Sequence, residues 1–427
     1  MTASHSRRGV QFLILALLVA SCTPSPAVTP TSPAPVATTV AAPTVPAPTV
    51  VPTAVPTTVP TAVPTTAPTA VPTLAPTPVP TATVPVSAGR IPLFAFQSPD
   101  NRILLSDAEG ALSAFAAAEF PFDSSPVFPS GRATSSTLYL LATSGPGGPQ
   151  GAYAVSGQGV RSLDFISRTG YMLTVWPGDA KQKPRLAWNV TEGTSAGMYS
   201  AIYTANTDGT ELRMLLEQES QDGHILLPLR WSRDGKRLFY SNEQTGFGGY
   251  ILFAGVSSLS VFDLAKGTGT TLIAEFRLGL NRYLCITDIS PDEKQVAHTC
   301  DDEHAVTALP LGGGEATTID SPPDVALESG QRGSARFGPD GARLAYAAAR
   351  GEYGDEQGWA LVDEGMLGVG RLIATSAPGD YYNVKGWLDD NTIVLQSNGE
   401  QPAVWLVYLD GTELKKVGEG LFLTIVP

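Results

Sequence analysis

A glycine-flanked serine gives the chain one spacing that is known from hydrolase chemistry. Residues 193–197 read Gly-Thr-Ser-Ala-Gly, the G-x-S-x-G pattern of a nucleophilic serine. That chemistry needs a strand before the serine, a helix after it, and an acid and a histidine alongside. Residues 198–203 instead alternate as a strand does, and His224 has no serine or cysteine partner visible in the sequence. The pattern is therefore interpreted as a loop, and no catalytic residue is predicted.

Two of the three cysteines, Cys285 and Cys300, lie on the two arms of an expected hairpin. In a hairpin, the residue numbers of any two directly opposed residues add up to the same value. The numbers of Cys285 and Cys300 add up to the same value as those of Ile289 and Val296, which flank the turn. Opposed Cβ atoms lie about 4.5–5.5 Å apart, close enough for a disulfide after small adjustment. The spacing therefore predicts a Cys285–Cys300 disulfide, which an oxidising compartment favours. Two free buried thiols are the alternative.

The same region gathers side chains that ligate metals in other proteins. Zinc requires three or four ligands that converge on one point. Only two of these residues share a strand face, and one of the two is already assigned to the disulfide, so no metal and no cofactor are predicted. The residues concerned are His298, Cys300, Asp301, Asp302 and His304.

The third cysteine, Cys22, follows a segment that reads as an export signal. A basic start with Arg7 and Arg8 precedes an apolar run, residues 10–20, that is too short for a comfortable transmembrane helix. The run ends in Val-Ala-Ser-Cys, a bacterial lipobox pattern. It predicts that residues 1–21 are a lipoprotein signal peptide and that Cys22 carries lipid, palmitate included, which holds the protein on a membrane. An ordinary secretory signal with a chance cysteine is the alternative.

Two repeated sequence motifs indicate which secondary-structure elements must position any functional site. In residues 231–240, 289–297 and 337–346 an apolar residue is followed by a tight polar turn and a second apolar residue, which is a β-hairpin signal. A second hairpin phrase occurs at residues 202–212 and 404–414. Together they give four strands per unit, recurring about every 40–50 residues, as in a β-propeller. The turn residues are Asp208, Gly209, Asp234, Gly235, Asp292, Asp340, Gly341, Asp410 and Gly411.

These turns resemble those of the TolB-like (WD-type, extracytoplasmic) β-propellers. The resemblance rests on Ser/Gly-Pro-Asp-Gly turns preceded by Trp or Phe and on Asp-Gly-Thr-Glu-Leu turns, and it covers roughly residues 91–427. It implies a propeller that serves as a protein-binding scaffold. It brings no shared catalytic residues with it.

Counting strands predicts an all-β fold of seven blades, with six as the alternative because residues 120–200 are irregular. Five units follow one another between residues 171 and 417, and residues 126–163 read as a degenerate blade. The segments left over are Leu93–Phe115 and the C-terminal Leu421–Val426. Joining them completes a seventh blade and closes the ring.

Composition separates a linker from this head. Residues 23–89 contain no charged side chain, and 18 of the 36 prolines fall between Pro24 and Pro85. Such a segment cannot bury a core, so residues 22–90 are predicted to be a disordered, extended linker that spaces the head from the membrane. A proline-rich ligand for a partner domain is the alternative.

The head itself is acidic, since it holds all 40 acidic residues and 24 of the 27 basic ones. This charge argues against nucleic acid as a partner, and a monomer is expected. Two functions stay open. The first is a lipid-anchored extracytoplasmic lipoprotein of a bacterial envelope that displays the propeller as a non-catalytic scaffold for a protein, peptide or glycan. The second is a hydrolase or lyase that acts on peptide or glycan in the propeller channel. Missing motifs favour the first, so the sequence predicts that the chain is not an enzyme.

Overall fold

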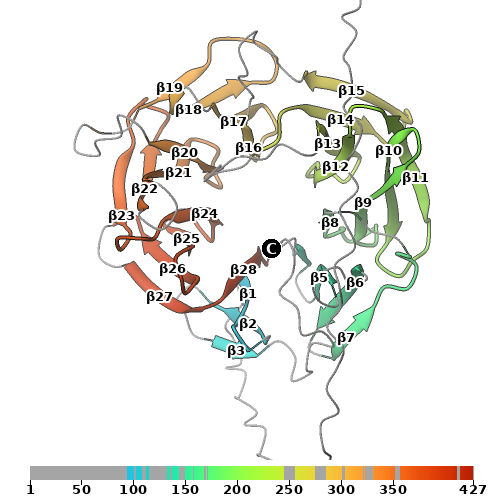
Figure 1. Ribbon diagram of the computed structural model, residues 1–427, viewed down its shortest axis with the longest axis horizontal. Helices are drawn as coiled ribbons and strands as arrows, with labels where there is room; N and C mark the ends of the chain where they lie inside the picture. The colour runs from blue at the N-terminus through green and yellow to red at the C-terminus, as the bar shows by residue number, and fades with distance from the viewer. Residues whose placement is uncertain are drawn as a thin grey trace, which may run out of the picture. The chain divides into compact units, whose positions relative to one another are not determined.

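A computed structural model describes most of the head, and the described residues consist of β-strands and their connections (Figure 1). The described part contains no helix long and apolar enough to cross a bilayer. Contacts divide the chain into two units, residues 1–77 and 78–427, and the second holds all of the described residues. These are 94–100, 102–107, 112–114, 132–134, 137–143, 150–156, 158–167, 170, 172–244, 255–274, 285–300, 303–320, 322, 330–351, 356–410 and 414–426.

The described residues form seven antiparallel sheets of four strands each, arranged around a central axis as the blades of a propeller (Figure 1). One blade is β28 (Leu421–Ile425), β1 (Phe94–Gln97), β2 (Ile103–Ser106) and β3 (Leu112–Ala114). The next is β4 (Arg132–Thr134), β5 (Thr137–Thr143), β6 (Gln150–Ser156) and β7 (Gly159–Ser162). The third is β8 (Leu173–Trp176), β9 (Arg185–Thr194), β10 (Gly197–Asn206) and β11 (Arg213–Ser220).

The remaining four blades follow in chain order. They begin with β12 (His224–Trp231), β13 (Arg237–Gln244), β14 (Leu259–Asp263) and β15 (Thr268–Ile273). Then come β16 (Cys285–Ile289), β17 (Gln295–Cys300), β18 (Glu303–Pro310) and β19 (Thr317–Ile319). After these lie β20 (Gln331–Phe337), β21 (Arg343–Arg350), β22 (Gln357–Glu364) and β23 (Arg371–Thr375). The last are β24 (Tyr382–Trp387), β25 (Thr392–Ser397), β26 (Ala403–Tyr408) and β27 (Leu414–Glu419).

Ring closure occurs as the sequence predicts. β28, from the C-terminus, pairs with β1 in antiparallel register, with Phe94 opposite Ile425 and Gln97 opposite Leu421. Figure 1 shows β28 on the axis side of β1. The two ends of the head therefore share one blade, and the count of seven blades is confirmed.

The repeated turns hold their shape through serine and aspartate side chains. In the turn between β12 and β13, Ser232 Oγ donates to Asp234 Oδ1 at 2.7 Å and accepts from the Arg237 backbone N–H at 2.9 Å. Gly235 follows at φ 66°, a left-handed conformation that glycine adopts without steric cost. The turn between β16 and β17 carries Glu293 at the same place, at φ 61°.

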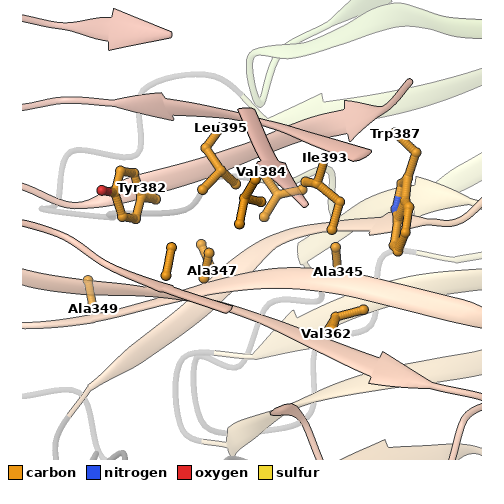
Figure 2. Close-up of a cluster of buried hydrophobic side chains, with 12 residues drawn as sticks. Ala345, Ala347, Ala349, Val362, Tyr382, Val384, Trp387, Ile393 and Leu395 are labelled. Carbon is orange, nitrogen blue, oxygen red and sulfur yellow. The ribbon is translucent and has the colours of Figure 1, made fainter. Parts of the chain in front are cut away.

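Neighbouring blades pack through apolar faces. Figure 2 shows Ala345 and Ala347 of β21 against Val384 of β24 and Ile393 and Leu395 of β25, all fully buried. The alanines are small enough for two sheets to approach closely, while the larger residues of the next blade fill the space between them. Burial of this kind, repeated between blades, stabilises the ring.

The innermost strands are irregular at a recurring place, close to their C-terminal ends. The register between the first two strands shifts at residues 228–230, 286–288, 333–336 and 384–386 of four successive blades. Each shift is a β-bulge or similar irregularity, which breaks the ladder locally and re-aims the side chains beside it.

One of these shifts corrects the argument for a disulfide. The bulge at Thr287 places Cys285 opposite Thr299 and not opposite Cys300, so the predicted opposition of the two cysteines is wrong. The argument from the sum of residue numbers assumes an uninterrupted ladder of paired residues. The bulge inserts one extra residue into β16 and so shifts the pairing. No disulfide is seen among the described residues. The side chain of Cys300 lies outside them, so the disulfide itself stays a prediction.

Candidate functional site

A cavity of about 480 Å³ lies among the inner strands of four blades. Its walls come from β16, β20, β24 and β28, which are neighbours around the axis (Figure 1). The charged and apolar lining residues stand near the ends of β16, β20 and β24, just before the turns that lead to the second strand of each blade. The lining residues are Asp288, Arg336, Phe337, Pro339, Lys385, Gly386, Trp387, Phe422, Leu423, Thr424 and Ile425.

Hydrogen bonds between blades fix two of the three charged side chains. Asp288 Oδ2 accepts from the Phe337 backbone N–H at 2.9 Å. Arg336 Nη1 donates to the carbonyl oxygens of Ala335, at 2.8 Å, and of Thr287. Asp288 and Arg336 are therefore positioned by their neighbours before any ligand arrives.

Lys385 is the third charged group, and it occupies the bulge of β24. The described residues provide neither a hydrogen-bond acceptor nor an ion-pair partner for its ammonium, and its side chain is half-buried. Desolvation, and secondly the positive charge of Arg336, lower its pKa from 10.5 to about 8. Lys385 is thus a cation at neutral pH whose ammonium has no ion-pair partner among the described residues.

Apolar side chains form the rest of the wall. Phe337, Trp387, Phe422 and Leu423 pack mainly in the cores between blades and line the cavity with the small part of each side chain that stays accessible. Ile425 approaches so closely that a Cβ on Gly386 would lie 2.5 Å from its Cδ1. Trp387 is held in turn by a hydrogen bond from its Nε1 to the Arg336 carbonyl oxygen, 3.0 Å long. The cavity thus combines positive charge with an apolar surface. It can bind an anionic group that has an apolar portion, and an amine of lowered pKa can also accept a proton.

The residues singled out from the sequence lie elsewhere, in hairpin turns. Asp208 and Gly209 connect β10 to β11, and Asp410 follows β26. The Lys183 ammonium donates to Asp208 at 2.7 Å, and this bond, with those from Thr210, holds the pKa of Asp208 well below its usual range. Asp234, Gly235, Asp292, Asp340 and Gly341 form the turns that follow the inner strands. Cys22 and Gly411 lie outside the described residues.

The G-x-S-x-G pentapeptide is a strand–turn–strand, as its sequence predicts. β9 ends at Thr194 and β10 begins at Gly197, so Ser195 is the first of two residues in a tight hairpin turn and is exposed. No helix follows it. This geometry differs from that of a nucleophile turn.

Sequence reasoning missed Asp288, Arg336 and Lys385, although a signal was present. Asp288 and Arg336 each stand directly before the apolar residue that opens a turn, and Arg230 occupies the same place before Trp231. Charged residues at an inner-strand position of a repeat, where apolar residues pack, would have indicated a site among the inner strands.

Comparison with known proteins identifies the fold but no family. No protein-family model and no curated protein matches the chain. Among solved structures, a prolyl endopeptidase aligns with a TM-score of 0.51 at 11% identity, over 77% of this chain and 48% of that one. The periplasmic gluconolactonase of Pseudomonas aeruginosa aligns with a TM-score of 0.45 at 13% identity, over 79% and 97%. An oligogalacturonate lyase of Vibrio parahaemolyticus aligns with a TM-score of 0.48 at 9% identity, over 74% and 91%. The chain spans only 38% and 36% of two further peptidases that it matches.

These likenesses change two of the expectations. The fold is a seven-bladed β-propeller, which this chain shares with a prolyl endopeptidase, and membership of the TolB-like group is not confirmed. The prediction that the chain is not an enzyme is wrong as an inference from missing motifs, because a prolyl endopeptidase shares this fold. The fold by itself does not show catalysis either.

Proposed function

We propose that the chain is a lipid-anchored extracytoplasmic protein that displays a propeller and binds a ligand in the cavity lined by β16, β20, β24 and β28. The single observation that carries the proposal is Lys385, a half-buried cation that faces a preformed cavity and has no partner among the described residues. Groups with strongly perturbed pKa values in a cavity are candidates for functional sites.

The remaining parts of the proposal come from the sequence. The Val-Ala-Ser-Cys pattern ending at Cys22 supports the anchor, and the proline-rich residues 22–90 support a spacer that presents the head away from the membrane. The acidic head supports a ligand other than nucleic acid.

Thermal unfolding of the full chain with a small ligand panel tests the binding site. The panel contains neutral oligosaccharides, short peptides with free or amidated C-termini, and small organic acids. At least one member should raise the melting temperature of the wild type and should have no effect on Ile425→Trp, which fills the cavity. If Ile425→Trp does not fold, Pro339→Trp at the exposed rim replaces it. Val369→Trp, on an exposed residue away from the cavity, is the control. A response that survives both cavity variants, or no response at all, would overturn the proposal.

A hydrolase or lyase acting on peptide or glycan is the second candidate. The lowered pKa of Lys385 favours it, because an amine with a pKa of about 8 can serve as a general base near neutral pH. Mass spectrometry of the same peptides and oligosaccharides after incubation tests it. Products that form with the wild type and not with Lys385→Met would establish turnover at this site.

A further inference from the structure

The formal charges of the cavity indicate the charge of its ligand. Arg336 and Lys385 contribute two positive charges and Asp288 one negative charge, so the cavity is net positive in a head whose acidic residues outnumber its basic ones. Asp288 and Arg336 accept from or donate to backbone groups of neighbouring blades, whereas the Lys385 ammonium has no such partner in the part of the chain that the structure describes. A net charge of one suits a monoanion, and the Asp288 carboxylate opposes a dianion such as phosphate.

The walls indicate the rest of the ligand. Phe337, Trp387, Phe422 and Leu423 pack in the cores between blades, and each presents only a small part of its side chain to the cavity. The volume of about 480 Å³ is that of a small-molecule site. A fully hydrated inorganic ion makes no use of such walls, whereas an apolar group attached to the anion gains by leaving water there.

We propose that the cavity binds a carboxylate attached to an apolar group, with Lys385 and Arg336 receiving the carboxylate and the aromatic side chains covering the apolar part. The inference rests on the proposed function, in which this cavity is the ligand site. Such a carboxylate has two sources, a free organic acid or the carboxyl terminus of a peptide that ends in an apolar residue.

Lys385 is the residue on which discrimination depends. Its position in the bulge of β24 aims it at the cavity from a strand whose ladder is interrupted at that point. Arg336 already donates to two backbone carbonyl oxygens, so it supplies positive charge from a fixed position. Removing the ammonium of Lys385 should therefore remove most of the preference for an anion and leave the apolar contacts in place.

Calorimetric titration of the full chain with matched probes tests the inference. The first pair is 3-phenylpropanoate and its uncharged amide, and the second is the peptide Ala-Ala-Phe with a free or an amidated C-terminus. Each acid should bind the wild type at least about tenfold more tightly than its amide, the factor that a hydrogen bond to a charged group provides. Comparison of the two pairs shows which source fits the cavity better. Inorganic phosphate at equal ionic strength should bind more weakly than either acid.

Variants separate this inference from the proposed function. Lys385→Met should lose about tenfold or more in affinity for the acids and bind the amides as the wild type does. Lys416→Met removes an exposed lysine of the same blade and should bind all probes unchanged. Equal binding of acid and amide by the wild type, or undiminished acid binding by Lys385→Met, would overturn the inference. If only neutral panel members stabilise the protein and Ile425→Trp abolishes their effect, the cavity is a ligand site, but the inference that its ligand is anionic is wrong.

Discussion

At the residue scale, Lys385 places a positive charge in a half-buried position beside the cavity. Its pKa falls from 10.5 to about 8, chiefly because of desolvation. Each unit of pKa shift corresponds to about 1.4 kcal/mol, so a charged Lys385 lowers the free energy of unfolding by at most about 3 kcal/mol near neutral pH, and by less where solvent screens the charge. A residue that weakens the fold by this amount is better explained by function than by packing.

The first prediction concerns the stability of Lys385→Met. Methionine has a similar length and no charge, so the substitution should raise the free energy of unfolding by up to about 3 kcal/mol near pH 7. Urea denaturation of wild type and variant, followed by tryptophan fluorescence, measures the difference. A variant that is less stable than the wild type would show that Lys385 has a stabilising partner.

The second prediction concerns the pH dependence of that difference. Because the folded-state pKa of Lys385 is lowered, protonation favours the unfolded chain. The cost is therefore fully present below about pH 8 and disappears as the pH rises toward 10.5. Asp288 from β16 and Arg336 from β20 are the charged groups that line the cavity with it, and β28 adds none. The advantage of Lys385→Met should accordingly shrink between about pH 7 and about pH 10 in the same urea experiment. An advantage of equal size at both pH values would contradict the assignment.

At the scale of elements, the turns after the inner strands also join neighbouring blades. The Glu293 carboxylate accepts a hydrogen bond from the Arg233 backbone N–H at 2.8 Å and pairs with the Arg237 guanidinium of the preceding blade. Glu293 makes these contacts from a left-handed conformation, φ 61°, that costs a non-glycine residue about 1–2 kcal/mol. Farther around the ring, Arg343 pairs with Asp390 of the next blade at 2.9 Å and lies 5.2 Å from the Trp387 ring centre.

The third prediction compares two substitutions of Glu293. Glu293→Ala loses the contacts to Arg233 and Arg237 and keeps the unfavourable φ, whereas Glu293→Gly loses the same contacts and relieves the backbone. Both should destabilise the head, and glycine should be the less harmful by about 1 kcal/mol. Urea denaturation of both variants at one pH measures the order. An alanine variant as stable as the glycine variant would show that φ at this position stores no strain.

The elements also show where prediction from sequence ends. The Asp-Gly turns and the closing strand follow from local chemistry and from counting strands, so they were predictable. The bulges at Thr287 and Lys385 depend on how an inner strand fits its neighbours, which no local pattern encodes. For that reason the predicted register of Cys285 is wrong. The charged residues Asp288 and Arg336 are visible in the sequence, but their meeting in one cavity is not. Its lining residues are brought together from four blades that are distant in sequence.

At the scale of the whole molecule, the fourth prediction concerns the anchor. If Cys22 carries lipid, Cys22→Ala should release the protein from the membrane fraction or leave it unprocessed. Membrane fractionation followed by immunoblotting measures this, with Cys285→Ala as the matched control that should stay on the membrane. A processed Cys22→Ala protein that sediments with membranes like the wild type would rule out the anchor.

The fifth prediction concerns the closure of the ring. β28 buries Phe422 and Leu423, and Phe422 stacks on Phe94 with ring centres 6.3 Å apart. Gln396 of the preceding blade also holds β28 in place through two hydrogen bonds. The Gln396 Oε1 accepts from the Phe422 N–H at 2.7 Å, and the Gln396 Nε2 donates to the Gly420 carbonyl oxygen at 3.0 Å.

Deleting residues 420–427 should therefore expose the edge of β1 and remove one wall of the cavity. Each buried large apolar side chain contributes about 1.5–3 kcal/mol, so the loss approaches the whole stability of a domain, and the truncated chain should aggregate or melt far below the wild type. A permuted variant tests whether closure itself is the cause. Ile425 lies opposite Phe94, so residues 420–427 can be moved ahead of β1 and joined to it by a short hairpin loop. Differential scanning calorimetry should then show recovery of most of the lost melting temperature. A truncated chain that melts like the wild type, or a permuted chain that stays as unstable as the truncated one, would mean that β28 does not hold the ring together.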